Sequence, residues 1–258
     1  MTDSVNFDRA VAYYDETRGF PPGVETHIPP LFVRAGNLNA ASRVLEIGIG
    51  TGRIAIPLAP HVGMYIGIDI STAMMDRLRA KRTNERIFVV QGDAARLPFA
   101  DASFDAVTAV HIFHLIPAWR GVLAEVRRVL KPGGALLHGW NGRNTDDTLQ
   151  AVWEAAIGDA REHTGTVPFS KQATFPLDEG WQTRGATEVL PFTFEQTANG
   201  YLDMIRQRKW SHCWKMSDDT ITTGLAALEA YAAAHYPNLD SAIQVQANFH
   251  VQAFTPPA

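Results

Sequence analysis

The chain contains a single cysteine, Cys213, so no disulfide can form within it and no metal site can be built from several thiolates. No apolar run approaches the roughly 18 residues that a membrane-spanning helix needs. The first residues also lack the basic and apolar regions of a secretory signal peptide. Together these absences predict a cytoplasmic protein.

An excess of positive charge is also missing. The formal net charge is −4, with 23 Lys and Arg against 27 Asp and Glu, which predicts no general attraction to nucleic acid or to an anionic membrane. Basic clusters at residues 77–82 and 206–209 lie in helical patterns, and we interpret them as solvated helix faces. The apolar fraction of 46% and the length of 258 residues suit one globular domain, with or without a cap.

The most informative segment is the run from Arg43 to Ile47, which is followed by glycines at positions 48, 50 and 52. Such a short apolar run predicts a buried parallel strand, and the glycines allow the backbone to approach a ligand closely. A second apolar run ends at Asp69, whose carboxylate is well placed to accept hydrogen bonds from a ribose diol. The two segments together predict a nucleoside-cofactor site at the carboxyl ends of parallel strands.

The spacing of the glycines distinguishes between nucleoside cofactors. A dinucleotide fingerprint has its third glycine three residues after the second, whereas here Arg53 occupies that position. The carboxylate of Glu46 would repel a pyrophosphate, and it suits a cofactor that carries sulfonium and ammonium groups. The pattern E-x-G-x-G-x-G, with an acid ending the second strand, resembles motif I of the class I S-adenosylmethionine-dependent methyltransferases. The resemblance implies that Glu46, Gly48, Gly50, Gly52 and Asp69 bind S-adenosylmethionine, with S-adenosylhomocysteine as the product.

Strands and helices are expected to alternate from Arg43 onward. The apolar patterns predict strands at residues 43–47, 64–69, 87–91, 104–110 and 135–139, with helices at 53–59, 72–82 and 117–130 between them. This alternation predicts a doubly wound parallel sheet. In the family resembled, two further strands follow, the last of them antiparallel, and residues 187–194 and 245–254 fit that count. The expected fold class is therefore α/β, with a Rossmann-like, doubly wound and mostly parallel sheet of seven strands.

The expected domain organisation is a single methyltransferase domain over residues 1–258. Residues 1–40 form an N-terminal helical lid, with helical patterns at 7–17 and 24–36, the second interrupted by Pro29 and Pro30. Residues 43–139 form the cofactor-binding core. The predicted substrate cap and C-terminal helices occupy residues 141–185 and 195–240, with helices at 145–163, 197–209 and 217–235.

The segment from Gln91 to Asp105 looks like the part of these methyltransferases that receives the adenine. At the end of the third strand, Asp93 could accept a hydrogen bond from the adenine amino group, and the N–H of Ala94 could donate to a ring nitrogen. Ile70 and Met74 could pack on the purine faces. An aspartate that only caps its own turn is the alternative for Asp93. Residues 130–137 also resemble the family, in which they stop a helix and form a tight turn before the fifth strand.

The N-terminal segment from Tyr13 to Gly19 is similar to the opening segment of the ubiquinone/menaquinone-methyltransferase-like (type 11) group. In that group the segment folds over the cofactor. Tyr14 and Arg18 are therefore candidate lid and substrate-binding residues. A surface helix with one packed tyrosine is the alternative.

The loop after the fourth strand, which lies beside the sulfonium in this fold, contains His111 and His114. Histidine titrates near neutral pH and can take a proton from a nucleophile, so both are candidate catalytic bases, and His111 is also expected to line the cofactor site. The alternatives are that His111 only contacts the cofactor or the backbone and that His114 packs beneath the next helix. Two histidines three positions apart with no evident third ligand do not suit a metal ion, and no metal is expected.

Residues Trp140, Asn141 and Arg143 follow the fifth strand and are candidate substrate contacts. The guanidinium of Arg143 would suit a carboxylate or phosphate. Trp210 belongs to an aromatic segment that either forms a wall of an acceptor pocket or packs in the core of the C-terminal helices. The many Phe and Trp side chains favour an apolar or aromatic small-molecule acceptor.

The leading hypothesis is methyl transfer by in-line displacement to an O, N or C nucleophile of a small molecule. We expect a monomer or homodimer with no nucleic-acid or membrane partner. An RNA or protein methyltransferase is an alternative, although an amine-methylating N/D-P-P-[YF] motif is absent where His111 to His114 stands. A non-catalytic protein that binds the cofactor is another. A nicotinamide-dependent reductase is disfavoured by the glycine spacing and by Glu46.

Overall fold

The computed structural model describes residues 5–143, 148–161 and 166–257. Contacts divide the chain into two compact units, and each is treated by itself. The first unit comprises residues 1–140, 165–190 and 249–258, and the second comprises residues 141–164 and 191–248. Among the described residues, no helix is long and apolar enough to cross a membrane.

The chain contains a seven-stranded sheet whose strand order is β3-β2-β1-β4-β5-β7-β6. Its first five strands pair in parallel, β1 with β2 and β4, β2 with β3, and β4 with β5. The strand order reverses between β1 and β4, and in such sheets ligands bind beyond the carboxyl ends of the strands at this point. The strands are β1 Arg43–Ile47, β2 Met64–Asp69, β3 Ile87–Gln91, β4 Phe104–Val110, β5 Leu130–Arg143, β6 Gln182–Gln196 and β7 Ile243–Thr255.

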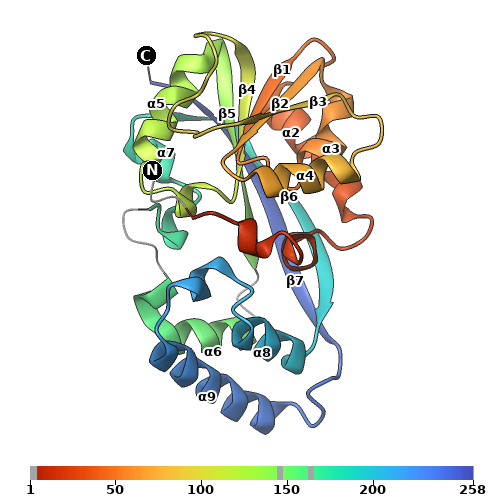
Figure 1. Ribbon diagram of the computed structural model, residues 1–258, viewed down its shortest axis with the longest axis vertical. Helices are drawn as coiled ribbons and strands as arrows, with labels where there is room; N and C mark the ends of the chain where they lie inside the picture. The colour runs from red at the N-terminus through yellow and green to blue at the C-terminus, as the bar shows by residue number, and fades with distance from the viewer. Residues whose placement is uncertain (1–4, 144–147, 162–165, 258) are drawn as a thin grey trace. The chain divides into compact units, whose positions relative to one another are not determined.

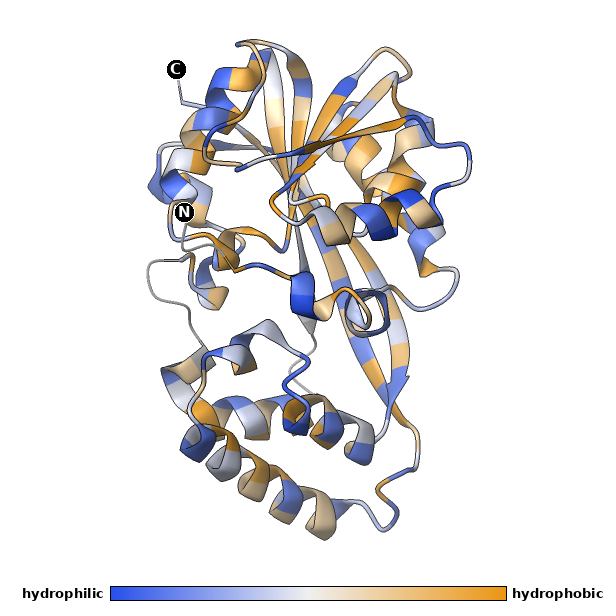
Figure 2. Cartoon of the chain, viewed as in Figure 1, coloured by the Kyte–Doolittle hydropathy of each residue, from blue (hydrophilic) through white to orange (hydrophobic). Residues whose placement is uncertain are grey.

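Helices cover both faces of the sheet in the first unit, with α5 and α7 on one side and α2, α3 and α4 on the other (Figure 1). Helix α5 is amphipathic, with buried residues at 119, 122, 123, 126 and 129, so hydrophobic and hydrophilic residues alternate along it (Figure 2). Successive residues of β5 serve the two faces, because Leu136 belongs to the core beneath α5 whereas Leu137 lies against Gly36 of α2. The helices of this unit are α1 Tyr14–Arg18, α2 Ile28–Gly36, α3 Ala55–Leu58, α4 Thr72–Lys81, α5 Trp119–Val129 and α7 Phe175–Asp178.

The second unit is built on three helices, α6 Thr148–Ile157, α8 Ala198–Arg206 and α9 Asp218–His235. Its apolar core joins residues from all three, including Trp153, Leu202 and Leu228. Helix α9 packs closely on α6 because Gly224 has no side chain, since a Cβ there would lie 2.3 Å from the Trp153 ring. The single cysteine, Cys213, is buried in this core.

The predicted fold class is confirmed, as are most strand positions, but two local predictions were wrong. Residues 7–17 do not form one helix, because a 3-10 turn at Asp8–Ala10 and the short α1 are separated by a non-helical turn. Pro29 and Pro30 do not interrupt their helix, since they occupy the first turn of α2, where no intrahelical N–H is needed. The predicted helix 145–163 is confirmed over α6 and ends in a 3-10 turn at Gly158–Arg161, while residues 145–147 and 162–163 lie outside the described chain.

The turn predicted before the fifth strand lies within β5 as a bulge. Leu130 pairs with Phe104 and Ala135 with Ala106, so four residues of β5 face a single residue of β4. Lys131 in this bulge donates from Nζ to both oxygens of Asp105, at 2.8 and 2.9 Å. Gly133 adopts a positive φ of 79°, which glycine reaches at little cost.

Arg184 of β6 ties three segments of the first unit together. Its guanidinium donates to the carbonyls of Ala35 and Gly36 at the end of α2, at 3.3 and 3.1 Å, and to Gly133 at 3.1 Å. Cationic groups stabilise the carbonyl end of a helix. We expect Arg184→Met to lower the free energy of unfolding by about 1–2 kcal/mol, because it removes these bonds from half-exposed carbonyls. Urea unfolding tests this, with Arg184→Lys as the control that keeps the charge, and an unchanged stability for Arg184→Met would contradict it.

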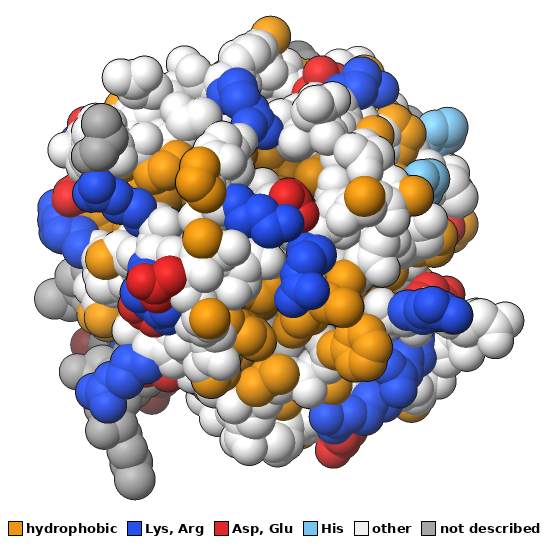
Figure 3. Space-filling view, turned by 90° about the horizontal axis from the view of Figure 1, so that it is seen from above, with side chains coloured by type: hydrophobic (Ala, Val, Ile, Leu, Met, Phe, Trp, Pro, Cys, Tyr) orange, Lys and Arg blue, Asp and Glu red, His pale blue; other side chains and the backbone are white. Residues whose placement is uncertain are grey.

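On the face drawn in Figure 3, Lys and Arg side chains occupy several separate places among apolar and uncharged groups. Many of the charged groups of the first unit are paired, such as Arg128 with Glu125 at 2.8 Å and with Asp101 at 2.7 Å. This arrangement resembles an ordinary solvated surface more than a continuous basic field for a polyanion.

Candidate active site

Three loops meet at the point where the strand order reverses. The loop after β1 contains the glycines at 48, 50 and 52, β2 ends at Asp69, and His111 follows β4. All three glycines have positive φ, at 70°, 53° and 79°. A Cβ on Gly48 would lie 2.4 Å from the Ile112 side chain, so this position requires glycine for space as well as for conformation. The loop can therefore bring its backbone N–H groups close to a ligand.

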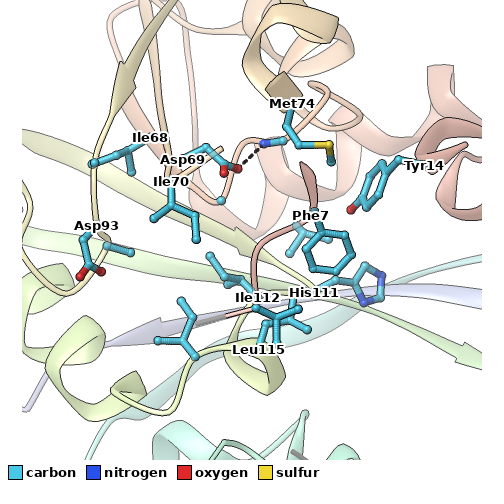
Figure 4. A pocket seen from close by; sticks show the side chains of 17 residues that line it. Phe7, Tyr14, Ile68, Asp69, Ile70, Met74, Asp93, His111, Ile112 and Leu115 are labelled. Carbon is cyan, nitrogen blue, oxygen red and sulfur yellow. Dashed lines mark hydrogen bonds between the residues drawn. The ribbon is translucent and has the colours of Figure 1, made fainter. Parts of the chain in front are cut away.

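Asp69 lies between the two loops that follow β1 and β2. The N–H of Gly50 donates to its Oδ2 at 2.8 Å, drawn as a dashed line in Figure 4, and the N–H of Ser71 donates to its Oδ1 at 2.9 Å. Burial raises the pKa of this carboxyl, although the backbone donors Ser71, Gly50 and Ile70 oppose the shift. A carboxylate has further acceptor positions beyond these two bonds, so Asp69 retains the capacity to accept from a ribose hydroxyl.

A cavity opens beside Asp69 and collects most of the predicted cofactor residues (Figure 4). Its acidic side contains Asp69 and Asp93, and a histidine, His111, lies at another side. Phe7 and Tyr14 of the N-terminal segment form one wall of it. The remaining lining is glycine or apolar, from Val5, Gly48, Gly50, Ile68, Ile70, Met74, Gly92, Ala94, Val110, Ile112, Leu115 and Ile116. The cavity thus has acceptors at one side and an apolar surface over much of the rest.

Asp93 caps its own turn, and its position is also compatible with the predicted adenine contact. Its Oδ1 accepts from the N–H of Ala95 at 2.9 Å, which is a turn-capping bond, and the residue also lines the cavity beside Ala94. A carboxylate that is fixed by one backbone donor can still accept a hydrogen bond from a ligand. The adenine role of Asp93 stays a prediction that its position permits.

Glu46 lies behind the glycine loop and, like Gly52, is not among the residues that line the cavity. Its side chain is 3% exposed, and the hydroxyl of Tyr65 donates to its Oε2 at 2.8 Å. Burial raises the pKa of Glu46 to about 8, against the opposing effects of the Tyr65 hydrogen bond and of Arg53. The structure therefore places Glu46 in the buried interior beside Tyr65 and away from the cavity lining. Its predicted contact with a cofactor ammonium stays a prediction.

The raised pKa of Glu46 predicts a pH dependence of stability. The carboxyl of Glu46 loses its proton near pH 4.5 in the unfolded chain and near pH 8 in the folded chain. Its contribution to the free energy of unfolding is therefore fully present below pH 4.5 and falls as the pH rises to about 8. Because Glu46→Gln cannot ionise, it should flatten the loss of stability across this window. Urea unfolding of both proteins at several pH values between 5 and 9, about half a unit apart, tests this. Parallel pH profiles for the two proteins would contradict the prediction.

His111 has a backbone conformation that is uncommon for a residue with a side chain, with φ at 54°. Its N–H donates to the carbonyl of Gly139 on β5 at 3.4 Å, and the residue lines the cavity. Strained backbone of this kind gathers at functional sites. The His114 ring, 6.4 Å from that of His111, is only 5% exposed and lies 4.8 Å from the ring of Phe169. The structure therefore brings the two histidines together but places only His111 on the cavity.

The Trp140 ring stacks with the rings of two histidines. The ring of His138 stacks on it at 5.4 Å between centroids and 21° between planes, and the ring of His250 at 5.2 Å and 6°. His138 is fully buried, which lowers its pKa to about 4, and its ring faces the carbonyl of Ala109 at 3.1 Å. These stacks hold the indole in place, and Trp140 is not among the residues that line the cavity.

The other predicted substrate residues are dispersed. Tyr14 lines the cavity, and the carbonyl of Arg18 accepts a hydrogen bond from Arg53 at 2.6 Å. Asn141 and Arg143 continue β5 in the second unit, and the side chain of Arg143 lies outside the described residues. Trp210 is also in the second unit, where its ring packs 4.9 Å from that of Tyr201. Among the described residues, no group of three or more His, Cys, Asp or Glu could hold a metal ion.

Sequence reasoning missed several residues around the cavity. Phe7 and Leu115 line it, and Asp8 and Asp15 bond to the loops that carry Asp69 and the glycines. A signal for the N-terminal ones is present, because an aromatic residue directly precedes an acid twice, at positions 7–8 and 14–15. No sequence pattern predicts that Leu115 lines the cavity or that histidine rings stack on Trp140.

A doubly wound sheet with a glycine loop after β1, an acid at the end of β2 and a cavity at the switch point defines a nucleoside-cofactor-binding domain. Comparison with known proteins narrows the class, since residues 45–138 match the methyltransferase domain family. The chain therefore contains a methyltransferase domain, similar to those of the class I S-adenosylmethionine-dependent enzymes that the sequence resembles, and its cofactor is S-adenosylmethionine. Gly48, Gly50 and Asp69, which face the cavity, fit that cofactor.

Two curated relatives and one solved structure illustrate the similarity. The fatty-acid O-methyltransferase of Mycolicibacterium smegmatis is 40% identical over 120 residues, which are 46% of this chain and 43% of the relative. The demethylmenaquinone methyltransferase of Lactobacillus johnsonii is 31% identical over 157 residues, 58% of this chain and 64% of the relative. The chain thus spans between two fifths and two thirds of these relatives.

The crystal structure of the YcgJ protein from Bacillus subtilis has the same fold. It superposes with a TM-score of 0.56, covering 90% of this chain and 99% of that chain at 22% identity. This likeness confirms the predicted fold class. The predicted family and cofactor are supported by the methyltransferase domain match over residues 45–138.

Proposed function

We propose that this chain transfers a methyl group from S-adenosylmethionine to an O, N or C nucleophile of a small, largely apolar acceptor. The observation that carries the proposal is the cavity at the switch point, which has Asp69 and Asp93 at one side, His111 at another and apolar side chains over most of its wall. The bound cofactor supplies an electrophilic methyl group on a sulfonium. The protein's part is to align the nucleophile with that methyl group and to exclude water.

On this proposal each side of the cavity holds one part of the cofactor. Asp69 accepts from the ribose hydroxyls, while Asp93 and the N–H of Ala94 meet the adenine edge. Ile70 and Met74, both lining the cavity, pack on the purine faces. The glycine loop gives close backbone approach through Gly48 and Gly50, which line the cavity. The predicted cofactor roles of Glu46 and Gly52 remain predictions.

His111 is the side chain best placed to take a proton from the acceptor. It lines the cavity, and the hydrogen bond from its N–H to Gly139 fixes its backbone. His114 is too buried to meet an acceptor directly, and we propose that it packs against Phe169 and sets the position of the loop. A positioned base of this kind matters for acceptors that lose a proton in the reaction.

An apolar acceptor is supported by the lining of the cavity and by the names of relatives. The relative in Mycolicibacterium smegmatis acts on fatty acids by name, and a relative in Mycobacterium ulcerans, 40% identical over 101 residues, acts on phthiotriol and phenolphthiotriol dimycocerosates. We propose a lipid-like or aromatic acceptor that Tyr14 and Trp140 contact. Roles for Arg18, Asn141, Arg143 and Trp210 remain predictions. The lid, core and cap division, the cytoplasmic location and the monomer or homodimer also remain predictions.

Transfer of tritiated methyl groups from S-adenosylmethionine tests the proposal. The purified protein is incubated with a panel of long-chain fatty acids, quinols, phenols and amines, and with bulk RNA as a polar comparison. We expect label in an organic-soluble product from an apolar acceptor, and none with Asp69→Ala. Label only in RNA or protein would instead favour those substrates. Bound cofactor without label in any acceptor would favour a binding protein without turnover.

A further inference from the structure

The N-terminal segment Val5–Phe20, which we call the strap, repeats a two-residue pattern of an aromatic ring followed by an acid. The pairs are Phe7-Asp8 and Tyr14-Asp15. The rings of Phe7 and Tyr14 meet edge to face, 5.7 Å between centroids and 89° between planes, and both line the cavity beside Asp69 (Figure 4). The strap therefore closes one side of the proposed cofactor site with its two rings.

The acid of the first pair bonds to the loop after β2. The hydroxyl of Ser71 donates to Asp8. The Ser71 oxygen also accepts from the N–H of Met74, so that Ser71 caps α4. The N–H of Ser71 in turn donates to Asp69 at 2.9 Å. Asp8 is therefore joined through one residue to the carboxylate that is proposed to bind the ribose.

The acid of the second pair bonds to the loop after β1. The hydroxyl of Thr51, which lies between Gly50 and Gly52, donates to Asp15 Oδ1 at 2.6 Å. Lys81 Nζ donates to both oxygens of Asp15 at 2.9 and 3.0 Å. Although burial alone would raise it, these bonds from Thr51 and Lys81 hold the pKa of Asp15 below its ordinary value. Asp15 is thus an ionised, half-buried link between the strap and the glycine loop.

The strap is also fixed at its two ends. The N–H of Val5 donates to the carbonyl of Leu115 at 3.1 Å, and Arg53 donates to the carbonyl of Arg18 at 2.6 Å. The guanidinium of Arg53 also lies over the ring of Phe20 at 4.7 Å. Between these ends, Asp8 and Asp15 are the side chains that bond to the two loops proposed to hold the cofactor.

We propose that Asp8 and Asp15 are positioning residues that latch the strap to the two cofactor loops, so that the bound cofactor leaves only after both latches open. A folded segment over a cofactor was expected from the family resemblance, but a role for these two acids was not. The inference rests on the proposed placement of the cofactor in this cavity. It predicts that the latches set the rate of cofactor release rather than the fold of the core.

Surface plasmon resonance with immobilised protein and S-adenosylhomocysteine measures that rate. Asp8→Asn and Asp15→Asn keep the size of each side chain and remove its charge. We expect each to raise the dissociation rate constant by about tenfold, because one charge-assisted hydrogen bond to the strap is weakened. The association rate constant should stay equal or rise, since an open strap does not block entry. Asp76→Asn, also a loss of one carboxylate but on the exposed side of α4, should leave both rates unchanged.

The dependence of the dissociation rate on salt concentration distinguishes the latch at Asp15 from the latch at Asp8. Asp15 is paired with Lys81, so the wild-type dissociation rate should increase when ionic strength is raised. Asp15→Asn should lose most of that dependence and Asp8→Asn should keep it. A purely structural role for Asp15 would shift thermal stability without this difference between the two variants.

A second variant tests the same latch from the partner side. Thr51→Val keeps the shape of the side chain and removes the hydroxyl that Asp15 accepts from, so it should also speed release. Combined with Asp15→Asn it should add less than its own single effect. The same surface plasmon resonance experiment gives the contradicting outcome. The proposal is wrong if Asp8→Asn, Asp15→Asn and Thr51→Val all release S-adenosylhomocysteine within about twofold of the wild-type rate. If Asp69→Ala loses cofactor binding while the dissociation rates of the latch variants stay unchanged, the proposed cofactor site is supported and the latch proposal is wrong. Unchanged cofactor binding by Asp69→Ala would instead show that the proposed cofactor site is wrong.

Discussion

Replacing Asp69 with alanine is expected to weaken the affinity for S-adenosylhomocysteine by at least about 100-fold, because charge-assisted hydrogen bonds of this kind contribute roughly 1.5–3 kcal/mol each. The substitution removes the acceptor proposed for the ribose. It also removes the bonds from the N–H groups of Gly50 and Ser71 that hold the two cofactor loops in register. Titration calorimetry at constant pH and salt measures the loss.

Two controls separate this effect from a general loss of structure. Asp69→Asn keeps the size of the side chain and one carbonyl oxygen, so its affinity should lie between those of wild type and Asp69→Ala. Asp76→Ala removes a carboxylate from the exposed side of α4 and should bind like wild type. Wild-type affinity in Asp69→Ala would show that the acid at the end of β2 does not bind the cofactor.

Replacing His111 with asparagine is expected to lower kcat by about 10²–10⁴-fold for an acceptor that loses a proton, the range found when a general base is removed. Asparagine is chosen because it tolerates the positive φ of 54° at this position better than most residues. The affinity for S-adenosylhomocysteine should change much less than kcat, since His111 forms one edge of the cavity rather than its polar side. Steady-state kinetics with the acceptor found in the methyl-transfer panel test this.

The pH profile identifies the cause. If His111 is the base, kcat/KM of the wild-type enzyme should rise with pH through the titration of a histidine, and His111→Asn should lose this rise. His111→Gly, which also relieves the backbone, should be as slow as His111→Asn. Equal pH profiles in wild type and His111→Asn would assign the residue to packing around the cofactor.

The core of the fold was predictable because each of its signals is local. The apolar runs that become β1 and β2 end in glycine or in an acid, and the glycine spacing is short enough to be read in one window. Helix α9 was also predicted to within one residue of its observed bounds, and it begins locally, because Ser217 caps it by accepting from the N–H of Thr220 at 3.1 Å. Such signals depend on neighbours in sequence, so they survive without knowledge of the tertiary structure.

The predictions of local structure were wrong where contacts between residues distant in sequence determine the conformation. Residues 7–17 have a helical pattern, but Asp8 and Asp15 bond to residues 63 and 36 positions away, and the chain breaks its helix between them. The ring stack on Trp140 joins β5 with β7, two strands that lie far apart in sequence. Pairings of this kind are set by the register of the sheet, which the sequence pattern alone does not determine.

The candidate site shows the same division. Asp69, Asp93 and His111 were predicted because each stands at the end of a strand, and the structure places all three on one cavity. Glu46 belongs to the same motif but lies behind the glycine loop, bonded to Tyr65, because alternate residues of a strand point to opposite faces. The sequence motif predicts which loop binds the cofactor. The pleat of the strand before that loop determines which of the motif's side chains can contact the cofactor.

The measurement that tests the central claim most directly is a calorimetric titration of the wild-type protein with S-adenosylhomocysteine, with NADH as the control ligand and Asp69→Ala as the control protein. The account predicts micromolar or tighter binding of S-adenosylhomocysteine to the wild type, no binding of NADH, and binding of S-adenosylhomocysteine to the variant that is weaker by at least about 100-fold. Binding of NADH with no binding of S-adenosylhomocysteine would contradict it.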